Sequence, residues 1–395
     1  MMKILWVAVL GLALGCGDTV EPREPDAPAL TTRQDELRVA IGPRGIAYDF
    51  AHRDTLTRGI AGDEHYVFVG EVFAGRVVVL NRFTGQQEGV LPTPPQGWGL
   101  LFGPKLLRPG LLYVLDAGAF PAPGVLANAR VHLYRYWHDS AGFHATIVRT
   151  DDFTAAFARA GFQSAFASDL AVLPDGGYIL TEQITGSLWR VTPSGQILRG
   201  VVPRSGAMQD AIPQLAGCLF PPGTVVDFAG VPFSFFGDFA PGANYVATNG
   251  QELFWESPCQ QKIFALPLWV FYDFRQPWDR IHSARVVSRA TKTAEILGGM
   301  SFNPYDPLDR GLYVCDPYVS RITRVNTVTG AREAVVSDPV LFNAPANVAF
   351  LPPVLGVTPL MVASSQEHRL AAINSQLSQD IVQPPWVVTK VVLTR

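Results

Sequence analysis

The stretch SDLAVLPDGGYILTEQITGSLWRVTPSGQIL, residues 168–198, decides the fold. Its short apolar runs, LAVL, YILTE, SLWRV and the run that begins at IL, are separated by PDGG, QITG and PSGQ. Glycine, proline and aspartate in such positions are typical of tight turns, whereas β-branched and aromatic residues favour strands. The pattern therefore predicts four antiparallel strands joined by short turns.

The same order of strands and turns recurs along the chain, which makes this meander one unit of a repeat. Clear copies begin at Arg58 and Gly298, partial copies at Trp98 and Asn347, and a further copy surrounds FSFFGDFAPGANYVATN. Six such units packed radially bury both faces of every sheet and leave only short edges. We predict an all-β fold over residues 37–395, a six-bladed β-propeller of four-stranded antiparallel blades. Two β-sandwiches are the alternative.

Both ends of this region have strand sequences, LRVAI from Leu37 and WVVTKVVLT from Trp386. We expect both in the last blade, where they close the ring. One short helix is predicted in DDFTAAFARAG, residues 151–161, between blades two and three. Apolar residues recur there at helical spacing, and the segment starts with aspartates and ends with glycine.

The N-terminus has the pattern of an export signal. Lys3 precedes an apolar run that is too short to span a bilayer, and the run ends in Ala13-Leu14-Gly15-Cys16. This ending resembles the lipobox of bacterial lipoproteins, in which the cysteine is lipidated. We predict a signal peptide at 1–15 and a lipidated Cys16 with a flexible tether at 16–36, rich in proline and charge. An ordinary signal peptide with a chance cysteine is the alternative.

These features place the body outside the cytoplasm, in the bacterial cell envelope. Gly17 rather than aspartate follows the cysteine, which favours the outer over the inner membrane. The net charge is −3 and there is no basic stripe, so nucleic acid is not an expected partner. In an oxidising compartment Cys218 and Cys259 are the predicted disulfide, whereas Cys315 in LYVCD is expected to be a buried strand residue.

Polar residues are expected to gather at one rim of the propeller, because the first strand of a blade starts where the second ends. The predicted ends of the second strands are Glu71, Asp116, Glu182, Asn249, Asp316 and Ser365. The predicted starts of the first strands are Arg58, Trp98, Asp169, Asp227, Gly299 and Asn347. So many carboxylates repel one another unless a cation neutralises them, and oxygen ligands suit Ca²⁺ or Mg²⁺ rather than zinc. Alternatively, each polar residue caps its own turn.

The repeats SDLAVLPDGGYILTEQITGSLWRVTPSG and GLYVCDPYVSRITRVNTVTG resemble blades of the six-bladed superfamily of SMP-30/gluconolactonase-like, NHL-repeat and strictosidine-synthase-like proteins. The gluconolactonase-like members hold a metal with Glu, Asn and Asp on inner strands. The resemblance implies Asp169, Asp227 and Asn347 as metal ligands. Arg58 stands where the family has its Glu, and an arginine there weakens a dication site or clamps an anionic ligand.

Two functions follow as hypotheses. In the first, the protein is a lipid-anchored module that binds a small ligand or an envelope protein. The ligand-binding residues are then Arg58, Glu71, Asp116, Asn249, Asp316, Trp255 and His368, with Trp255 lining an apolar pocket over the channel. In the second, it is a metal-dependent hydrolase of lactones or esters, in which Glu182 activates water. No phosphate loop, HExxH or CxxC motif is present, so nucleotide and zinc chemistry have no support.

Overall fold

The computed structural model describes the following residues: 38–40, 46–49, 56–72, 74–119, 128–162, 165–201, 225–234, 242–258, 260–272, 284–289, 298–371, 374–382 and 387–394. All of them belong to one compact unit, residues 32–395. The predicted signal peptide, Cys16, Cys218 and Cys259 lie outside the described residues. No helix within the described ranges is long and apolar enough to cross a membrane.

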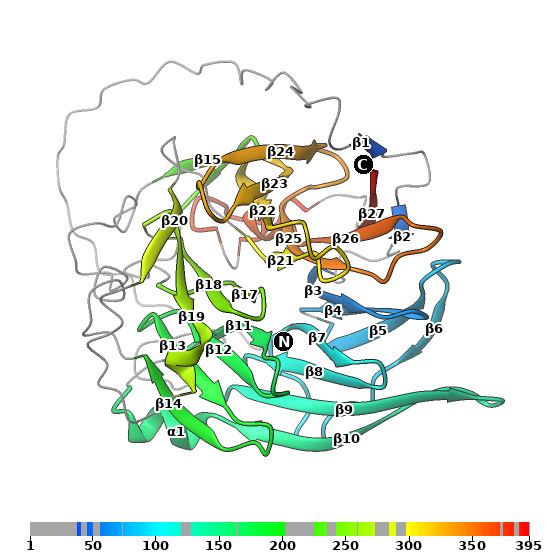
Figure 1. The fold of residues 1–395 in the computed structure, drawn as a ribbon, viewed down its shortest axis with the longest axis vertical. Coiled ribbons are helices and arrows are strands. Elements are labelled where there is room, and N and C mark those ends of the chain that lie inside the picture. Colours follow the sequence, from blue (N-terminus) through cyan, green and yellow to red (C-terminus); the bar gives the residue numbers. More distant parts are fainter. Residues whose placement is uncertain are drawn as a thin grey trace. The chain divides into compact units, whose positions relative to one another are not determined.

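Six sheets of antiparallel strands stand around one axis, which confirms the predicted propeller (Figure 1). Blade one has β3 (Thr57–Gly62), β4 (Tyr66–Glu71), β5 (Arg76–Asn81) and β6 (Gln87–Val90). Blade two has β7 (Leu101–Arg108), β8 (Leu111–Asp116), β9 (Arg130–Asp139) and β10 (Gly142–Asp152). Blade three has β11 (Ala167–Val172), β12 (Tyr178–Glu182), β13 (Ser187–Val191) and β14 (Ile197–Val201).

Blade four has β17 (Val246–Thr248), β18 (Glu252–Ser257), β19 (Lys262–Pro267) and β20 (Arg285–Arg289). Blade five has β21 (Met300–Phe302), β22 (Gly311–Asp316), β23 (Arg321–Asn326) and β24 (Arg332–Ser337). Blade six has β25 (Pro345–Phe350), β26 (Thr358–Ser364) and β27 (Val387–Thr394), and both β1 (Arg38–Ala40) and β2 (Ile46–Asp49) pair with β27. The two ends of the propeller region thus share the last blade, as predicted.

The ring is held together by a separate hydrophobic cluster at each junction between neighbouring blades. Phe68 of blade one packs with Val114 of blade two, and equivalent clusters follow around the ring. The last cluster joins Val388 of blade six to Val67 of blade one, which closes the ring. Within the described residues, each sheet thus buries apolar side chains on both faces, which removes them from water.

A few short elements lie outside the blades. The helix α1 (Thr154–Arg159) is where it was predicted, and its Phe157 packs between blades two and three. Its N-cap is Phe153 rather than an aspartate, but the Asp152 carboxylate accepts the amide of Thr154 at 2.9 Å. A separate hairpin comprises β15 (Val226–Phe228) and β16 (Val231–Phe233). The 3-10 turns in the described part of the chain are η1 (Leu268–Phe271), η3 (Pro317–Val319) and η4 (Glu367–Arg369).

The meander gives the propeller two distinct rims. We call site rim the one where first strands start and second strands end, near Asp169 and Glu182. We call cavity rim the opposite one, which carries the turns from first to second and from third to fourth strands. The inner strands β3 and β7 touch at Gly59 and Gly103, where an added Cβ on Gly59 would lie 2.1 Å from the Gly103 Cα. Only glycine permits this close approach of blades one and two near the site rim.

Candidate ligand-binding site

Two of the acids that end second strands are paired with arginines of their own hairpins. Glu71 binds Arg76, and Asp316 binds Arg321 at 2.7 Å. Each arginine is the register partner of its acid across the turn. Burial raises the pKa of Glu71, although Arg76 opposes this effect. Both acids are therefore neutralised locally, without a shared cation.

The other two strand-end acids accept backbone amides. Asp116 accepts the amides of Gly99 at 3.1 Å and Gly118 at 2.9 Å. Glu182 is fully buried, and its carboxylate accepts the amides of three residues at 2.8–2.9 Å: Phe166, Ile184 and Thr185. Burial raises the pKa of both carboxyls, and these hydrogen bonds partly offset the rise. Glu182, predicted to activate water, thus has both carboxylate oxygens committed to backbone amides, two in its own turn and one just before β11. For Asp116 and Glu182, backbone capping therefore describes the carboxylates better than a shared cation site.

Arg58 occupies the centre of the site rim. Its guanidinium carbon lies 3.8 Å from the ring centroid of Phe102 and 5.5 Å from that of Tyr245. Its Nη1 donates to Glu367 Oε1 at 2.8 Å. Burial by itself lowers the pKa of Arg58, but Glu367, Tyr245 and Asp169 raise it above its ordinary value. The side chain is therefore a permanent, buried cation that links blades one and six.

A second cation meets the inner-strand acid Asp169. Lys105 Nζ lies 3.0 Å from Asp169 Oδ1, and the amide of Val246 donates to Asp169 Oδ2 at 3.2 Å. Asp169 thus lies on the inner strand of blade three, as predicted, and joins blades two, three and four. Lys105 was not predicted, because a lone lysine in the run FGPKLL has no pattern that marks it as a channel residue.

A buried polar network connects blades three and four. Gln183 Nε2 donates to Ser168 Oγ at 2.7 Å, and both side chains contact the Asn244 side-chain oxygen. Asn244 Nδ2 in turn donates to Glu256 Oε1 at 3.1 Å. Glu256 is fully buried, and its Oε2 has no hydrogen-bond partner within the described part of the chain. Burial raises the pKa of the Glu256 carboxyl well above its ordinary value.

Further buried polar atoms at this rim lack a partner among the residues that the structure describes. They are Arg58 Nε, Ser257 Oγ, Gln260 Nε2, Asn347 Nδ2 and His368 Nδ1. They belong to blades one, four and six and come from residues that are at most 8% exposed. Native proteins satisfy nearly all buried polar atoms, so a cluster of exceptions indicates a place for water or a ligand.

The β15–β16 hairpin covers part of this rim. Phe228 stacks on His368 with ring centroids 4.6 Å apart, and the amide of Ala229 donates to the carbonyl of Tyr318 at 3.0 Å. Asn374 Nδ2 bridges the carbonyls of Pro232 and His368. His368 lies on the predicted rim, but it is fully buried, and burial lowers its pKa to about 3. It is therefore a neutral side chain packed beneath the hairpin.

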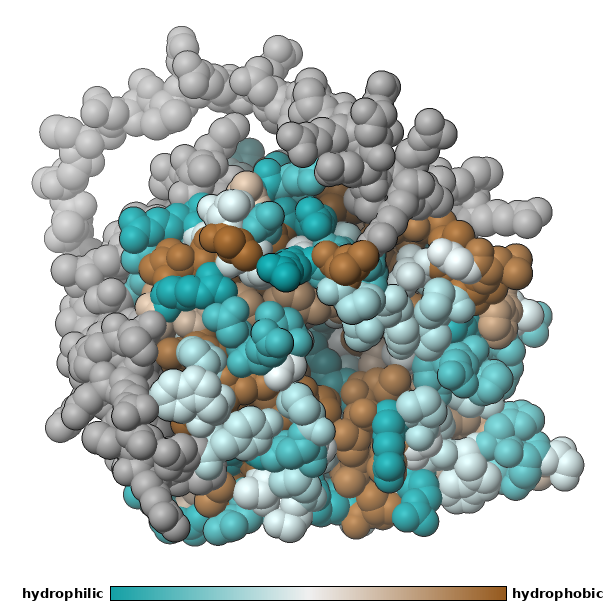
Figure 2. Space-filling model, viewed as in Figure 1, coloured by the Kyte–Doolittle hydropathy of each residue, from teal (hydrophilic) through white to brown (hydrophobic). Residues whose placement is uncertain are grey.

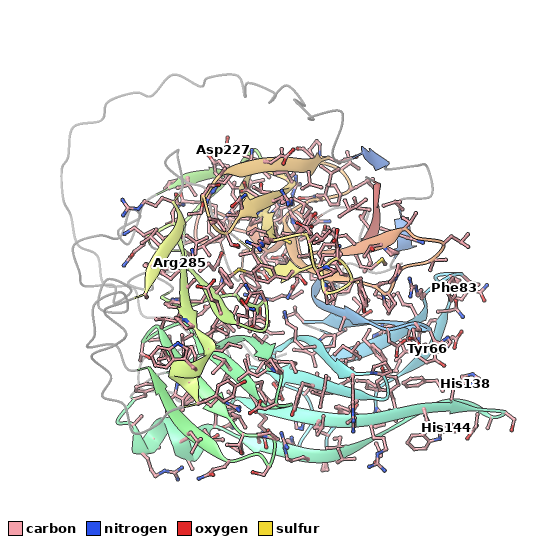
Figure 3. All side chains as sticks on the ribbon, viewed as in Figure 1. Tyr66, Phe83, His138, His144, Asp227 and Arg285 are labelled. Atoms are coloured by element: carbon pink, nitrogen blue, oxygen red, sulfur yellow. The ribbon has the colours of Figure 1, made fainter. Side chains whose placement is uncertain are left out.

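Asp227 and Asn249 do not lie at the predicted positions, because the strands of blade four were assigned wrongly. The segment from Asp227 was predicted to be the first strand of blade four. Asp227 instead belongs to the separate hairpin, where its carboxylate accepts the amide of Gly230 at 2.7 Å. Figure 3 shows Asp227 at the periphery of the fold. Asn249 follows the first strand of blade four, not the second, and caps a turn on the cavity rim by accepting the amide of Glu252 at 2.8 Å.

Trp255 does not line a pocket. It lies in the middle of β18, is 1% exposed, and stacks on Phe264 with centroids 5.5 Å apart. Its cluster joins blades three and four. Because the strands of blade four were assigned wrongly, Glu256 was not predicted as a site residue. The strand ELFWES has an acid near its end, as YVFVGE does in blade one, and this pattern identifies β18 as a second strand.

The site rim as described does not fit a divalent metal. Asn347 lies fully buried on the inner strand of blade six, as predicted, but Asp227 lies outside the channel and Asp169 is paired with Lys105. Across the described ranges, no group of three or more His, Cys, Asp and Glu side chains could hold a metal ion. Cys315 is buried and free, as expected.

A cavity of about 1370 Å³ opens on the cavity rim. Its wall includes inner-strand residues of the blades, among them Ile60, Leu170 and Met300, and Lys105 reaches it from the side of Asp169. Figure 2 shows the surface hollowed near the middle of the face in view. The Lys105–Asp169 pair thus lies between the polar site rim and this wider cavity.

Comparisons with known proteins show the fold. No family model matches the chain, and no curated sequence matches it. The major allergen Mala s 1 of Malassezia sympodialis is 12% identical, with a TM-score of 0.58 over 87% of this chain and 95% of that one. A PQQ-bound aldose sugar dehydrogenase from Streptomyces coelicolor is 12% identical, with a TM-score of 0.51 over 91% and 98% of the two chains.

A luciferin-regenerating enzyme is also 12% identical, with a TM-score of 0.51 over 86% of this chain and 92% of that one. At such identities a likeness shows architecture and not activity. The comparisons and the strand topology together confirm that this chain is a six-bladed β-propeller, similar in fold to propeller enzymes.

Proposed function

We propose that this protein is a lipid-anchored ligand-binding protein of the bacterial cell envelope, whose site rim binds a small polar molecule. Cys16 would carry the lipid and hold the propeller outside the cytoplasm. The observation that carries the proposal is the cluster of buried, unpartnered polar atoms around Arg58 and Glu256. A ligand that supplies their missing hydrogen bonds would recover the free energy that desolvation costs.

The charges of the rim favour a neutral ligand. Arg58 is offset by Glu367, and Lys105 by Asp169. A Glu256 carboxyl with a raised pKa is protonated over a wider pH range and then adds no charge. The unpartnered atoms include both donors and acceptors, a combination that suits a polyhydroxylated molecule such as a sugar or a sugar lactone.

A hydrolase of lactones is the second candidate, because a buried carboxyl with a raised pKa, such as Glu256, can act as a general acid. The calcium-dependent form of this candidate needs Asp169, which is paired with Lys105, and Asp227, which lies in the separate hairpin. The two candidates differ in turnover, and the metal-dependent form also differs in its response to calcium.

Calorimetric melting of the chain that begins at Gly17 tests the proposal, with calcium chloride and with a panel of neutral sugars and sugar lactones. We expect no response to millimolar calcium, and a saturable rise in Tm with a polar ligand that is lost in Glu256→Leu. Glu252→Gln, at a partly exposed acid on the cavity rim, is the matched control. A saturable rise with calcium that Asp169→Asn abolishes would favour the metal-dependent hydrolase instead.

A further inference from the structure

We propose that the cavity rim is a membrane-contacting face, which rests its apolar turn tips on a lipid surface. Large apolar side chains stand exposed on the turns of this rim in blades one, four, five and six, and near the end of β9 in blade two. They include Phe83, Trp137, Trp269, Leu308, Val328 and Leu355. The inference is independent of ligand binding at the site rim.

The most exposed large apolar side chains that the structure describes belong to this set. Leu355 is fully exposed, Leu308 is 81% exposed and Val328 is 73% exposed. Each lies at or near the tip of a turn that joins a first to a second strand or a third to a fourth strand. Phe83 lies on such a turn too, and Figure 3 shows it at the outer edge of blade one. Scattered apolar residues are normal on a surface, but tips that share one rim point to a common contact.

The site rim provides an internal comparison. Its exposed large apolar residues, among those that the structure describes, include Val90, Val225, Val319, Val340 and Ile381. None of them is aromatic, whereas the cavity rim exposes phenylalanine, tryptophan and tyrosine. Tryptophan and leucine are the residues with which peripheral proteins enter the boundary between headgroups and acyl chains.

The layout of the tips favours a bilayer over a protein partner. The apolar side chains stand on separate turns around a cavity of about 1370 Å³. A protein interface needs a continuous, closely packed patch, which the hollow interrupts. A fluid bilayer accepts separate tips, since each inserts on its own. We therefore expect the cavity rim to contact lipid rather than a protein.

Charge does not drive the contact. Several charged residues of this rim pair with one another: Arg285 binds Glu252 at 2.8 Å, and Arg324 binds Asp309 at 2.6 Å. With no net basic surface, attachment should not depend on anionic lipids. The predicted tether after Cys16 would span ~25 Å on average and at most ~70 Å, so an anchor would allow either rim to face the membrane.

The experiment uses the chain from Gly17 to Arg395, which retains every described element because these lie between Arg38 and Thr394. Flotation is measured with vesicles of phosphatidylcholine alone, and with phosphatidylethanolamine and phosphatidylglycerol. We expect binding to both, maintained at high salt, and a loss of about tenfold or more in partitioning for the combined variant Leu308→Ser, Val328→Ser, Leu355→Ser. The matched control Val225→Ser, Val319→Ser, Val340→Ser should bind as the wild type does.

Depth provides the second readout. Lipids brominated in the acyl chains should quench tryptophan fluorescence in the wild type, and less in Trp269→Phe. Absence of flotation, or equal loss in both triple variants, would overturn the proposal. A dimer in solution that only the cavity-rim variant dissociates would also overturn it, and would identify this face as an interface between copies of the chain.

Discussion

The two rims of this propeller are built from the same meander, yet they manage polar and apolar groups in opposite ways. At the site rim, Arg58, Asn244 and Glu256 are buried among blades, and a hairpin packs over His368. At the cavity rim, tight turns expose apolar side chains such as Leu355 around an open hollow. The site rim therefore contains buried polar groups without hydrogen-bond partners among the described residues, and the cavity rim contains exposed apolar side chains.

The difference has a structural origin in the connections. The site rim carries the links between blades, and one of these includes the β15–β16 hairpin, which reaches the η3 and η4 turns of blades five and six. The cavity rim carries turns within blades, and the tips of several described turns, such as Val328 and Leu355, are exposed. A long connection such as the one with the β15–β16 hairpin covers polar side chains of the rim, as Phe228 covers His368.

The largest loss of stability should come from replacing Arg58 at the site rim. Arg58→Ala removes a buried cation, opens a gap between Phe102 and Tyr245, and leaves Glu367 unpaired. We expect the free energy of unfolding to fall by about 3–5 kcal/mol in denaturant titration. Arg310→Ala, at an exposed arginine of the cavity rim, should change it by less than about 0.5 kcal/mol. Equal losses would contradict the contrast between the rims.

A smaller effect should separate Glu256 from other acids by its pH dependence. Burial raises the pKa of this carboxyl in the native state, so over the pH range between its unfolded and native values the folded protein holds a proton that the unfolded chain has lost. Stability must therefore fall as pH rises through this range. Glu256→Gln keeps the hydrogen bond with Asn244 and cannot ionise. It should be more stable than the wild type by about 1–3 kcal/mol near pH 8, and similar to it near pH 4.

The control for this prediction is Glu252→Gln on the cavity rim, where the carboxylate pairs with Arg285 in contact with solvent. It should not gain stability as pH rises. Unfolding free energies across the pH range check both variants. If the unfolding free energies of wild type and Glu256→Gln changed in parallel with pH, Glu256 would ionise in the native state as it does in the unfolded chain. The proposed ligand site would then carry a negative charge, which would contradict the proposal of a neutral site.

Much of the architecture could be predicted from sequence because a propeller repeats a local pattern. Alternating strands and glycine turns identify blades one, two, three, five and six, and the strand sequences at Leu37 and Trp386 predict the closing blade. Blade four was misplaced because VVDFAGVPF, residues 225–233, has the alternation and the turn of a hairpin. Local sequence predicts a hairpin, but it does not say which sheet, if any, that hairpin joins.

The site itself could be predicted only in part. Asp169 and Asn347 were placed correctly because inner-strand starts follow from the repeat. The contacts that decide its chemistry, however, join residues that are far apart: Arg58 meets Glu367 across 309 positions. Whether an acid at a strand end is free or capped also depends on side-chain geometry, and for Glu182 three backbone amides decide it.

The smallest effects are expected where two predicted site residues proved to be turn caps. Asp227 accepts one amide in an exposed hairpin turn and Asn249 accepts two on the cavity rim, so each Ala variant should lose no more than about 1 kcal/mol. Asp169→Ala should lose several times more, because Lys105 and the amide of Val246 both lose their partner. Denaturant midpoints at an unchanged m-value give the comparison. If Asp227→Ala were as damaging as Asp169→Ala, the hairpin would be an energetic part of the site rim, and its carboxylate would belong to the binding site after all.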